Sequence, residues 1–166
     1  MAKITLQGNE INTNGNLPEV GAVAPDFVLV DKDLGNVSLS AFLGKKKILS
    51  IVPSLDTPVC AISTKKFNDY AKEHDDMVVL IVAADLPFAM SRFCGAESLE
   101  DVKTLSVMRS QDFSRDYGVL IEDGPLAGIL ARAVVVLDED NAVLHAELVS
   151  EIANEPDYEA ALQAIG

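Results

Sequence analysis

The middle of the chain alternates between apolar runs and a helical pattern, and this order leaves few possible folds. Residues 47–52 form a short, nearly continuous apolar run that ends at Pro53, and residues 77–83 form a second run that is entirely apolar. Both have the length and composition of strands that are buried on both faces. Between them, residues 58–74 carry apolar side chains near helical spacing. Two buried strands joined by a helix predict a right-handed crossover between parallel strands of one sheet.

Further strands and helices are predicted on either side of this crossover. Residues 1–16 alternate in hydrophobicity around Gly8–Asn9, which predicts an N-terminal β-hairpin. The other predicted strands are Phe27–Val30, Val37–Leu39, Thr104–Met108, Ile129–Leu137 and Ala142–Leu148, and the other predicted helices are Pro87–Cys94, Phe113–Tyr117 and Pro156–Ile165. This order matches a thioredoxin-like α/β sandwich, with a mixed central sheet flanked by helices and the N-terminal β-hairpin in front. We expect residues 1–166 to form a single domain, because the sequence contains no repeat and no linker.

Charge and composition narrow the classes of function. The net charge of −13 argues against nucleic-acid binding, which depends on neutralising phosphates with Lys and Arg. The longest apolar stretch, Met77–Ala84, is far shorter than the roughly 20 residues that span a bilayer, and the N-terminus has no apolar signal region. We therefore expect a cytoplasmic protein without a membrane segment. In a reducing compartment, a redox or catalytic role is favoured over a structural disulfide for the two cysteines.

Cys60 lies between a predicted buried strand and a predicted helix. Thr57 is a favourable N-cap and Pro58 a favourable first helical residue, so Cys60 falls at about the third helical position. Free N–H groups and partial positive charge at a helix start favour a thiolate, which is the reactive form of cysteine. The carboxyl edge of an α/β sheet is also where ligand sites usually form. Taken residue by residue, a reactive thiol and a buried core thiol remain equally open.

The string that ends at Cys60 carries a known pattern. Residues 53–60 read Pro-Ser-Leu-Asp-Thr-Pro-Val-Cys, which resembles the Pro-x-x-x-Thr-x-x-Cys pattern of peroxiredoxins at every fixed position. Three further segments look like the bacterial thiol peroxidase branch of that family, namely Ser91–Gly95, Asp123–Leu126 and Ala131–Val136. The similarity covers nearly the full length and includes the N-terminal hairpin typical of the branch. It implies a thioredoxin-like fold with both reactive cysteines on one chain.

The resemblance implies a role for each residue around Cys60. Cys60 would be the peroxidatic cysteine, whose thiolate attacks a peroxide and becomes a sulfenic acid. Thr57 would supply a hydroxyl and Arg132 a cation for the charge on the departing oxygen, and Pro53 would keep water from the sulfur. From the residues alone, Arg132 interrupts an apolar run and needs a partner, and a structural ion pair with an acidic side chain is the alternative. Arg92 competes for the same role because it is close to the second cysteine, although a surface position explains it more simply.

The second cysteine, Cys94, lies near the end of the helix predicted from Pro87, with Gly95 as a predicted C-cap. Thirty-three residues separate it from Cys60, so the pair forms neither a Cys-x-x-Cys motif nor a zinc motif. The resemblance makes Cys94 the resolving cysteine, which condenses with the sulfenic acid to an intramolecular disulfide. A half-buried structural cysteine is the alternative. A disulfide requires the two Cα atoms to approach within roughly 4.4–6.8 Å, so we expect local unwinding around one or both cysteines.

The implied partners are small molecules and other protein chains. The substrates would be hydrogen peroxide and organic hydroperoxides, thioredoxin would reduce the disulfide, and a homodimer is expected from the resemblance. No cofactor or metal site is expected, because nothing near His74 and His145 suggests a metal and the acidic residues are scattered. Two other functions remain open, namely a thiol redox sensor or regulator that uses the same disulfide, and a thioredoxin-like binding domain with inert thiols.

Overall fold

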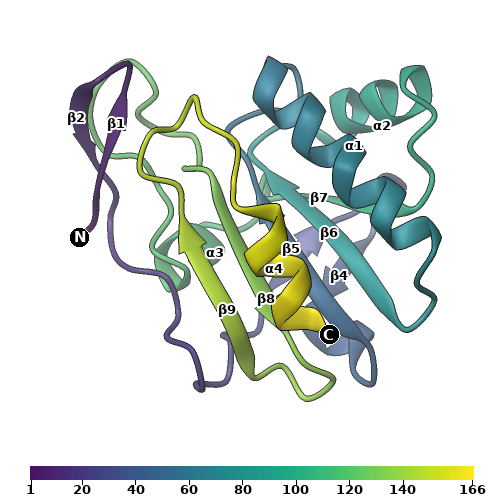
Figure 1. The fold of residues 1–166 in the computed structure, drawn as a ribbon. Helices are drawn as coiled ribbons and strands as arrows, with labels where there is room; N and C mark the ends of the chain where they lie inside the picture. Colours follow the sequence, from purple (N-terminus) through teal and green to yellow (C-terminus); the bar gives the residue numbers. More distant parts are fainter.

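A mixed sheet of seven strands forms the centre of the computed structural model, which describes residues 1–166. Its strands are β3 (Val28–Val30), β4 (Asn36–Ser38), β5 (Lys46–Ile51), β6 (Met77–Ala83), β7 (Val102–Ser106), β8 (Ala133–Leu137) and β9 (Val143–Leu148). In space their order is β4-β3-β7-β6-β5-β8-β9 (Figure 1). β5, β6 and β7 are parallel neighbours, whereas β3, β4, β8 and β9 join by antiparallel pairing. The predicted parallel pairing of the two apolar runs and the predicted mixed sheet are confirmed.

Helices cover both faces of this sheet. They are α1 (Pro58–Lys72), α2 (Pro87–Ala96), α3 (Asp112–Asp116) and α4 (Tyr158–Ile165), together with a short 3-10 helix, η1 (Leu39–Phe42). α1, α2 and α4 share one core layer, which includes Phe67 and Met90, and Figure 1 shows α1 and α4 in front of the sheet. α3 and η1 belong to a second core layer, to which they contribute Phe113 and Leu39. None of the helices is both long enough and apolar enough to cross a membrane.

The spacing of small and apolar side chains along α1 determines which of its faces meets the sheet. The helix buries one stripe at intervals of three and four residues, made of Cys60, Ser63, Thr64, Phe67 and Asn68. Phe67 is fully buried, which stabilises the packing by about 1.5–3 kcal/mol. Because Cys60 begins this stripe, its side chain points towards the core layer rather than towards solvent.

Two predictions at the ends of elements were wrong. The strand predicted to begin at Ile129 begins instead at Ala133, because the preceding residues pair elsewhere, with Leu130 bridging to Leu120. Arg132 therefore lies just before the strand and not inside it. Gly95 was predicted as a C-cap but lies inside α2, which continues to Ala96. The C-cap is Glu97, and the positive φ of 56° that follows the helix belongs to Ser98.

The predicted N-terminal hairpin is present and forms a separate two-stranded sheet. Its strands are β1 (Lys3–Leu6) and β2 (Asn9–Asn12), with Ile4 opposite Ile11. Figure 1 shows the hairpin at one end of the molecule, beyond the edge of the main sheet. Its two isoleucines are buried against Ile121, Ala131 and Ile152, which come from loops around β8 and β9. The first residues of the chain are thus packed onto segments from its last third.

Candidate active site

Cys60 lies in the first turn of α1, close to the carboxyl end of β5. Thr57 is the N-cap and Pro58 the first helical residue, so Cys60 is the third residue of the helix, as predicted. Its side chain is fully buried in the core layer shared by α1, α2 and α4. Cys60 and Cys94 are both free thiols in this structure. The protein therefore keeps the Cys60 sulfur away from bulk water at a helix start.

Arg132 brings a buried positive charge to this sulfur. Its Nη1 donates a hydrogen bond to Cys60 Sγ at 3.1 Å, and its Nε donates to the Ile152 carbonyl oxygen at 2.9 Å. The residue is only 4% exposed, and none of the salt bridges in the structure includes it. The alternative of an ion pair with an acidic side chain is therefore wrong. The partners that the buried guanidinium requires are a sulfur atom and a backbone carbonyl.

The Thr57 hydroxyl does not cap α1, although Thr57 occupies the N-cap position. Thr57 Oγ1 instead donates to the Ser54 carbonyl oxygen at 2.8 Å, which closes the turn before the helix. The first helical hydrogen bond is donated by Ala61 N to Thr57 O at 3.0 Å. The N–H groups of Val59 and Cys60 consequently have no acceptor in the protein. Two free N–H donors and the lone pairs of a hydroxyl oxygen are available in the turn that carries the thiol.

An aspartate at the end of a neighbouring strand holds the loop in front of α1. Asp85 follows β6, and its carboxylate accepts hydrogen bonds from Ser54 Oγ and from Leu55 N, both at 2.8 Å. Pro53 is buried where the chain leaves β5. The loop is thus held by the strand on one side and by the carboxylate on the other. These contacts fix the carbonyl to which the Thr57 hydroxyl donates.

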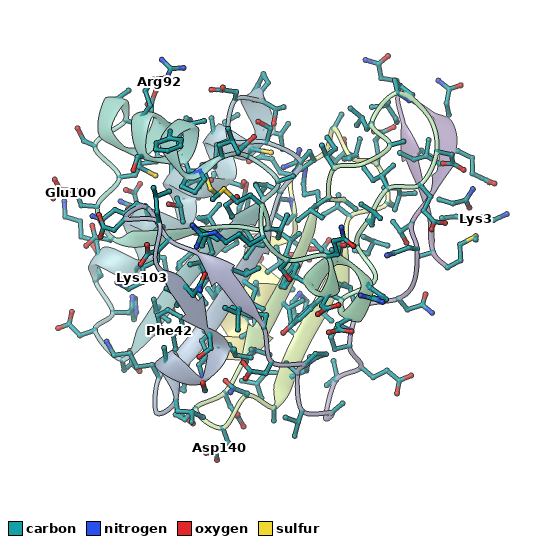
Figure 2. All side chains as sticks on the ribbon, turned by 180° about the vertical axis from the view of Figure 1, so that it is seen from behind. Lys3, Phe42, Arg92, Glu100, Lys103 and Asp140 are labelled. Carbon is teal, nitrogen blue, oxygen red and sulfur yellow. The ribbon has the colours of Figure 1, made fainter.

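Cys94 occupies a different setting in the last turn of α2. It is half-buried against the core layer that contains Cys60. Cys94 borders a cavity of about 700 Å³, whose walls also include Phe42, Glu100 and Lys103. These last three residues are labelled in Figure 2. Burial raises the pKa of the Cys94 thiol, and the positive charge of Lys32 opposes this rise. The thiol is therefore held in its protonated form more strongly than that of an exposed cysteine.

A smaller cavity, of about 320 Å³, lies between the start of α1 and the end of α2. Its walls include Thr57 and Pro58 from α1 and Phe93 and Ala96 from α2. A small molecule that enters this cavity reaches the first turn of α1. Arg92 borders the same cavity but is exposed, and it projects outward from the molecule in Figure 2. The guanidinium that contacts the Cys60 sulfur is that of Arg132. Arg92 lies on the surface, which was its simpler interpretation from the sequence.

Sequence reasoning missed two residues of this site, Asp85 and Ile152. Asp85 directly follows the apolar stretch Met77–Ala84, so it lies at the same edge of the parallel strands as the loop before Cys60. The preference of sites for this edge could have found it. Ile152 contributes its backbone carbonyl, which no side-chain pattern marks. No group of three or more His, Cys, Asp or Glu side chains is placed to hold a metal ion.

Comparisons with known proteins agree with this geometry. The family model described as Redoxin matches residues 19–162. A thiol peroxidase of Mycobacterium bovis is 55% identical over 166 residues, which are 100% of this chain and 99% of that protein. The chain belongs to the Redoxin family. With a thiol peroxidase relative at this level of identity over its whole length, this Redoxin family member is a peroxidase-type oxidoreductase.

Two solved structures are similar to this one over nearly the whole chain. A peroxiredoxin-like protein from Aquifex aeolicus has a TM-score of 0.93 at 39% identity, covering 99% of this chain and 96% of that chain. A thiol peroxidase from Chromobacterium violaceum has a TM-score of 0.90 at 23% identity, covering 97% of this chain and 93% of that chain. The second likeness concerns the fold alone. The predicted thioredoxin-like α/β fold with its N-terminal hairpin is confirmed.

Proposed function

We propose that this protein reduces hydroperoxides with Cys60 as the peroxidatic cysteine and Cys94 as the resolving cysteine. One contact supports the proposal above all, the 3.1 Å hydrogen bond from Arg132 Nη1 to Cys60 Sγ. A guanidinium keeps its charge at any physiological pH, and away from water its field is screened weakly. It therefore places a fixed positive charge against the sulfur that would attack the peroxide as a thiolate.

In the first step, the Cys60 thiolate attacks the terminal oxygen of a hydroperoxide, ROOH. A bond forms between sulfur and that oxygen, the O–O bond breaks, and RO⁻ leaves and takes up a proton to become an alcohol, or water when R is hydrogen. Cys60 is then a sulfenic acid. Arg132 and the free N–H groups of Val59 and Cys60 would stabilise the negative charge on the departing oxygen.

Thr57 and Pro53 would prepare the peroxide for this attack. The proton of the Thr57 hydroxyl is donated to the Ser54 carbonyl, so the oxygen offers lone pairs that can accept the O–H of the peroxide. Such a bond would orient the terminal oxygen towards the sulfur. Pro53, buried beside the same loop, would exclude water from the reacting atoms.

In the second step, the Cys94 thiolate attacks the Cys60 sulfur, the S–S bond forms, and hydroxide leaves as water after protonation. Cys60 is fully buried in a helical turn and Cys94 is half-buried in another helix. We infer that the first turn of α1, the last turn of α2 or both unwind so that the sulfur atoms can meet. Thioredoxin would then reduce the disulfide by exchange, in the cytoplasm, where thiols are kept reduced.

The test is turnover of hydrogen peroxide and of an organic hydroperoxide with thioredoxin, thioredoxin reductase and NADPH. Turnover is measured as the loss of NADPH absorbance. Cys60→Ser is expected to abolish turnover. Cys94→Ser is the matched control, since it should consume one equivalent of peroxide and then stall as a sulfenic acid. Full turnover by Cys60→Ser would overturn the proposal. A wild-type protein that oxidises once and is not reduced by thioredoxin would instead be the redox sensor considered above.

We also propose that the chain forms a homodimer. Leu86 and Phe88, at the start of α2, are 54% and 66% exposed, and they follow Asp85, which holds the loop in front of Cys60. Exposed apolar side chains beside an active site offer a surface that a second copy can cover. Sedimentation equilibrium should give twice the monomer mass, and a monomeric mass at micromolar concentration would contradict the dimer.

A single cooperative unfolding transition is expected if residues 1–166 form one domain.

A further inference from the structure

The carbonyl group that accepts from Arg132 belongs to a peptide group that is also held from its other side. Arg132 Nε donates to Ile152 O at 2.9 Å. The N–H of Ala153 belongs to the same peptide group as this carbonyl. That N–H donates to Glu151 Oε2 at 3.0 Å. Because a peptide group is planar and rigid, a bond that fixes its N–H also fixes the direction of its C=O. The Glu151 carboxylate therefore sets the direction of the acceptor that Arg132 uses.

The other oxygen of this carboxylate is bound to the N-terminal hairpin. Glu151 Oε1 accepts hydrogen bonds from Thr5 Oγ1 at 3.0 Å and from Gly8 N at 2.9 Å. The hydrogen bonds from Ala153 N and Gly8 N are the main reason why the pKa of Glu151 lies below its ordinary value of 4.5. One charged carboxylate thus bridges the turn of the hairpin and the peptide that faces Arg132.

The backbone and the core reinforce this bridge. Thr5 N donates to Ser150 O at 2.7 Å, and Ile152 N donates to Thr5 O at 2.9 Å, so β1 and the loop are joined by an isolated parallel bridge between Thr5 and Glu151. The Ile152 side chain is 3% exposed and packs against Ile4 and Ile11 of the hairpin. The hairpin consequently fixes Ile152 through its N–H, its side chain and the peptide that follows it.

We propose that Glu151 is a positioning residue for Arg132, and that the β1–β2 hairpin influences the reactivity of Cys60 through it. The inference rests on the proposed function, because it concerns the guanidinium that acts on the Cys60 thiolate. A rigid acceptor at Nε holds the planar guanidinium so that Nη1 stays directed at the sulfur. When the acceptor is free to turn, the guanidinium samples orientations in which that contact is lost, and misplacement of this kind slows a reaction.

Glu151→Gln is the test variant, and Glu10→Gln is its matched control. Glutamine keeps the size of the side chain but has one acceptor oxygen and one NH₂ group. The NH₂ group would therefore face an N–H donor, either that of Ala153 or that of Gly8, and one of these hydrogen bonds is lost. Glu10 lies on the same hairpin, and its carboxylate forms an exposed ion pair with Lys3. The measurement is the rate constant for oxidation of Cys60 by hydrogen peroxide in a single turnover, by rapid quenching and mass spectrometry. We expect a fall of about 5-fold in Glu151→Gln and a change within about 1.5-fold in Glu10→Gln.

The same substitution in an Arg132→Met protein separates positioning from general stability. With no guanidinium left to misplace, Glu151→Gln should change the rate by less than about 1.5-fold relative to Arg132→Met alone. Thr5→Val removes one hydrogen bond to Glu151 and should cost about 2-fold, which provides a second route if Glu151→Gln melts below the assay temperature. A wild-type rate in Glu151→Gln, or an equal loss in the Arg132→Met background, would overturn the inference. The proposed function fails separately, if Arg132→Met itself oxidises as fast as the wild type.

Discussion

The two cysteines share one core layer but lie in opposite settings. Cys60 is at the start of a helix, is fully buried and receives a hydrogen bond from a guanidinium. Cys94 is in the last turn of a helix, borders a cavity of about 700 Å³, and has its pKa raised by burial. The helices strengthen the contrast, because the partial charge is positive at a helix start and negative at its end. One sulfur thus lies beside a fixed positive charge at a helix start, whereas the other lies at a helix end and would have to move before it could reach the first.

Replacing the cation at Cys60 should give the largest effect. Arg132→Met is expected to lower the rate constant for Cys60 oxidation by hydrogen peroxide about 10²- to 10³-fold, because a preorganised charge at the reacting atoms is lost. The control is Arg92→Met, which removes an exposed guanidinium from α2 and should leave the rate nearly unchanged. Equal effects of the two substitutions, measured by quenched single turnovers, would remove the distinction between the two cysteine settings.

The rearrangement required at Cys94 should be visible as a loss of amide protection. In the disulfide form, the hydrogen-bonded amides at the start of α1, from Ala61 onward, and those in the last turn of α2 should exchange with deuterium roughly 100-fold faster than in the thiol form, because these turns open locally. Amides of β6, which is buried along its whole length, serve as the internal control and should not change. Identical exchange patterns in the two forms would show that the disulfide forms without unwinding.

The raised pKa of Cys94 predicts how its reaction depends on pH. Only the thiolate attacks the sulfenic acid, and below its pKa the thiolate fraction of a thiol rises about tenfold per pH unit. The rate of disulfide formation should therefore rise about tenfold from pH 7 to pH 8. If α2 unwinds before the attack, burial no longer raises the pKa of the Cys94 thiol. The rate should then stop rising near pH 9.0, the ordinary pKa of a cysteine. A rate of disulfide formation that does not change with pH would contradict the contrast between the two thiols.

Removal of the Thr57 hydroxyl should have the smallest of these effects. Thr57→Val keeps the shape of the side chain but removes the hydrogen bond to the Ser54 carbonyl and the lone pairs offered to the peroxide. The second-order rate constant of peroxide reduction should fall about 5-fold. Thr57→Ser restores the hydroxyl and should recover most of the rate. A loss of the same size in both variants would mean that the methyl group, and not the hydroxyl, matters at this position.

Local patterns predicted most of the fold because its central elements are defined by local spacing. The apolar runs became β5 and β6, and the helical pattern of residues 58–74 became α1. The buried face of α1 was not predicted, because it consists mainly of small and polar side chains from Cys60 to Asn68, whereas Ile62 is 46% exposed. The start of β8 was wrong because the residues before Ala133 pair with the segment around Leu120 and do not join the main sheet. Gly95 was misplaced because α2 continues one residue past it, and in a helix a glycine costs only about 1 kcal/mol.

The candidate site divides in the same way. Thr57 and Cys60 were found because a short string marks a helix start, and the structure places both there. From the residues alone the partners of Arg132 could not be found, since they are a thiol far away in sequence and a backbone carbonyl, and only the family resemblance placed Arg132 near Cys60. The position of that carbonyl depends on the hairpin, and such long-range packing leaves no periodic signal. The proposed catalytic roles of these residues stay predictions until the variants are measured.

The wide spacing of the site along the sequence has a consequence for a chain that is still being synthesised. Arg132 follows Cys60 by 72 positions, and Ile152 follows Arg132 by a further 20. Because the ribosome releases the N-terminal part first, the emerging Cys60 has no cation beside it. The nascent hairpin likewise lacks its contacts with Ile121 and Ala131 until those residues have been made, and its bridge to Glu151 forms last. The surroundings of the Cys60 thiol are therefore completed only after Ile152 has been made and has left the ribosome.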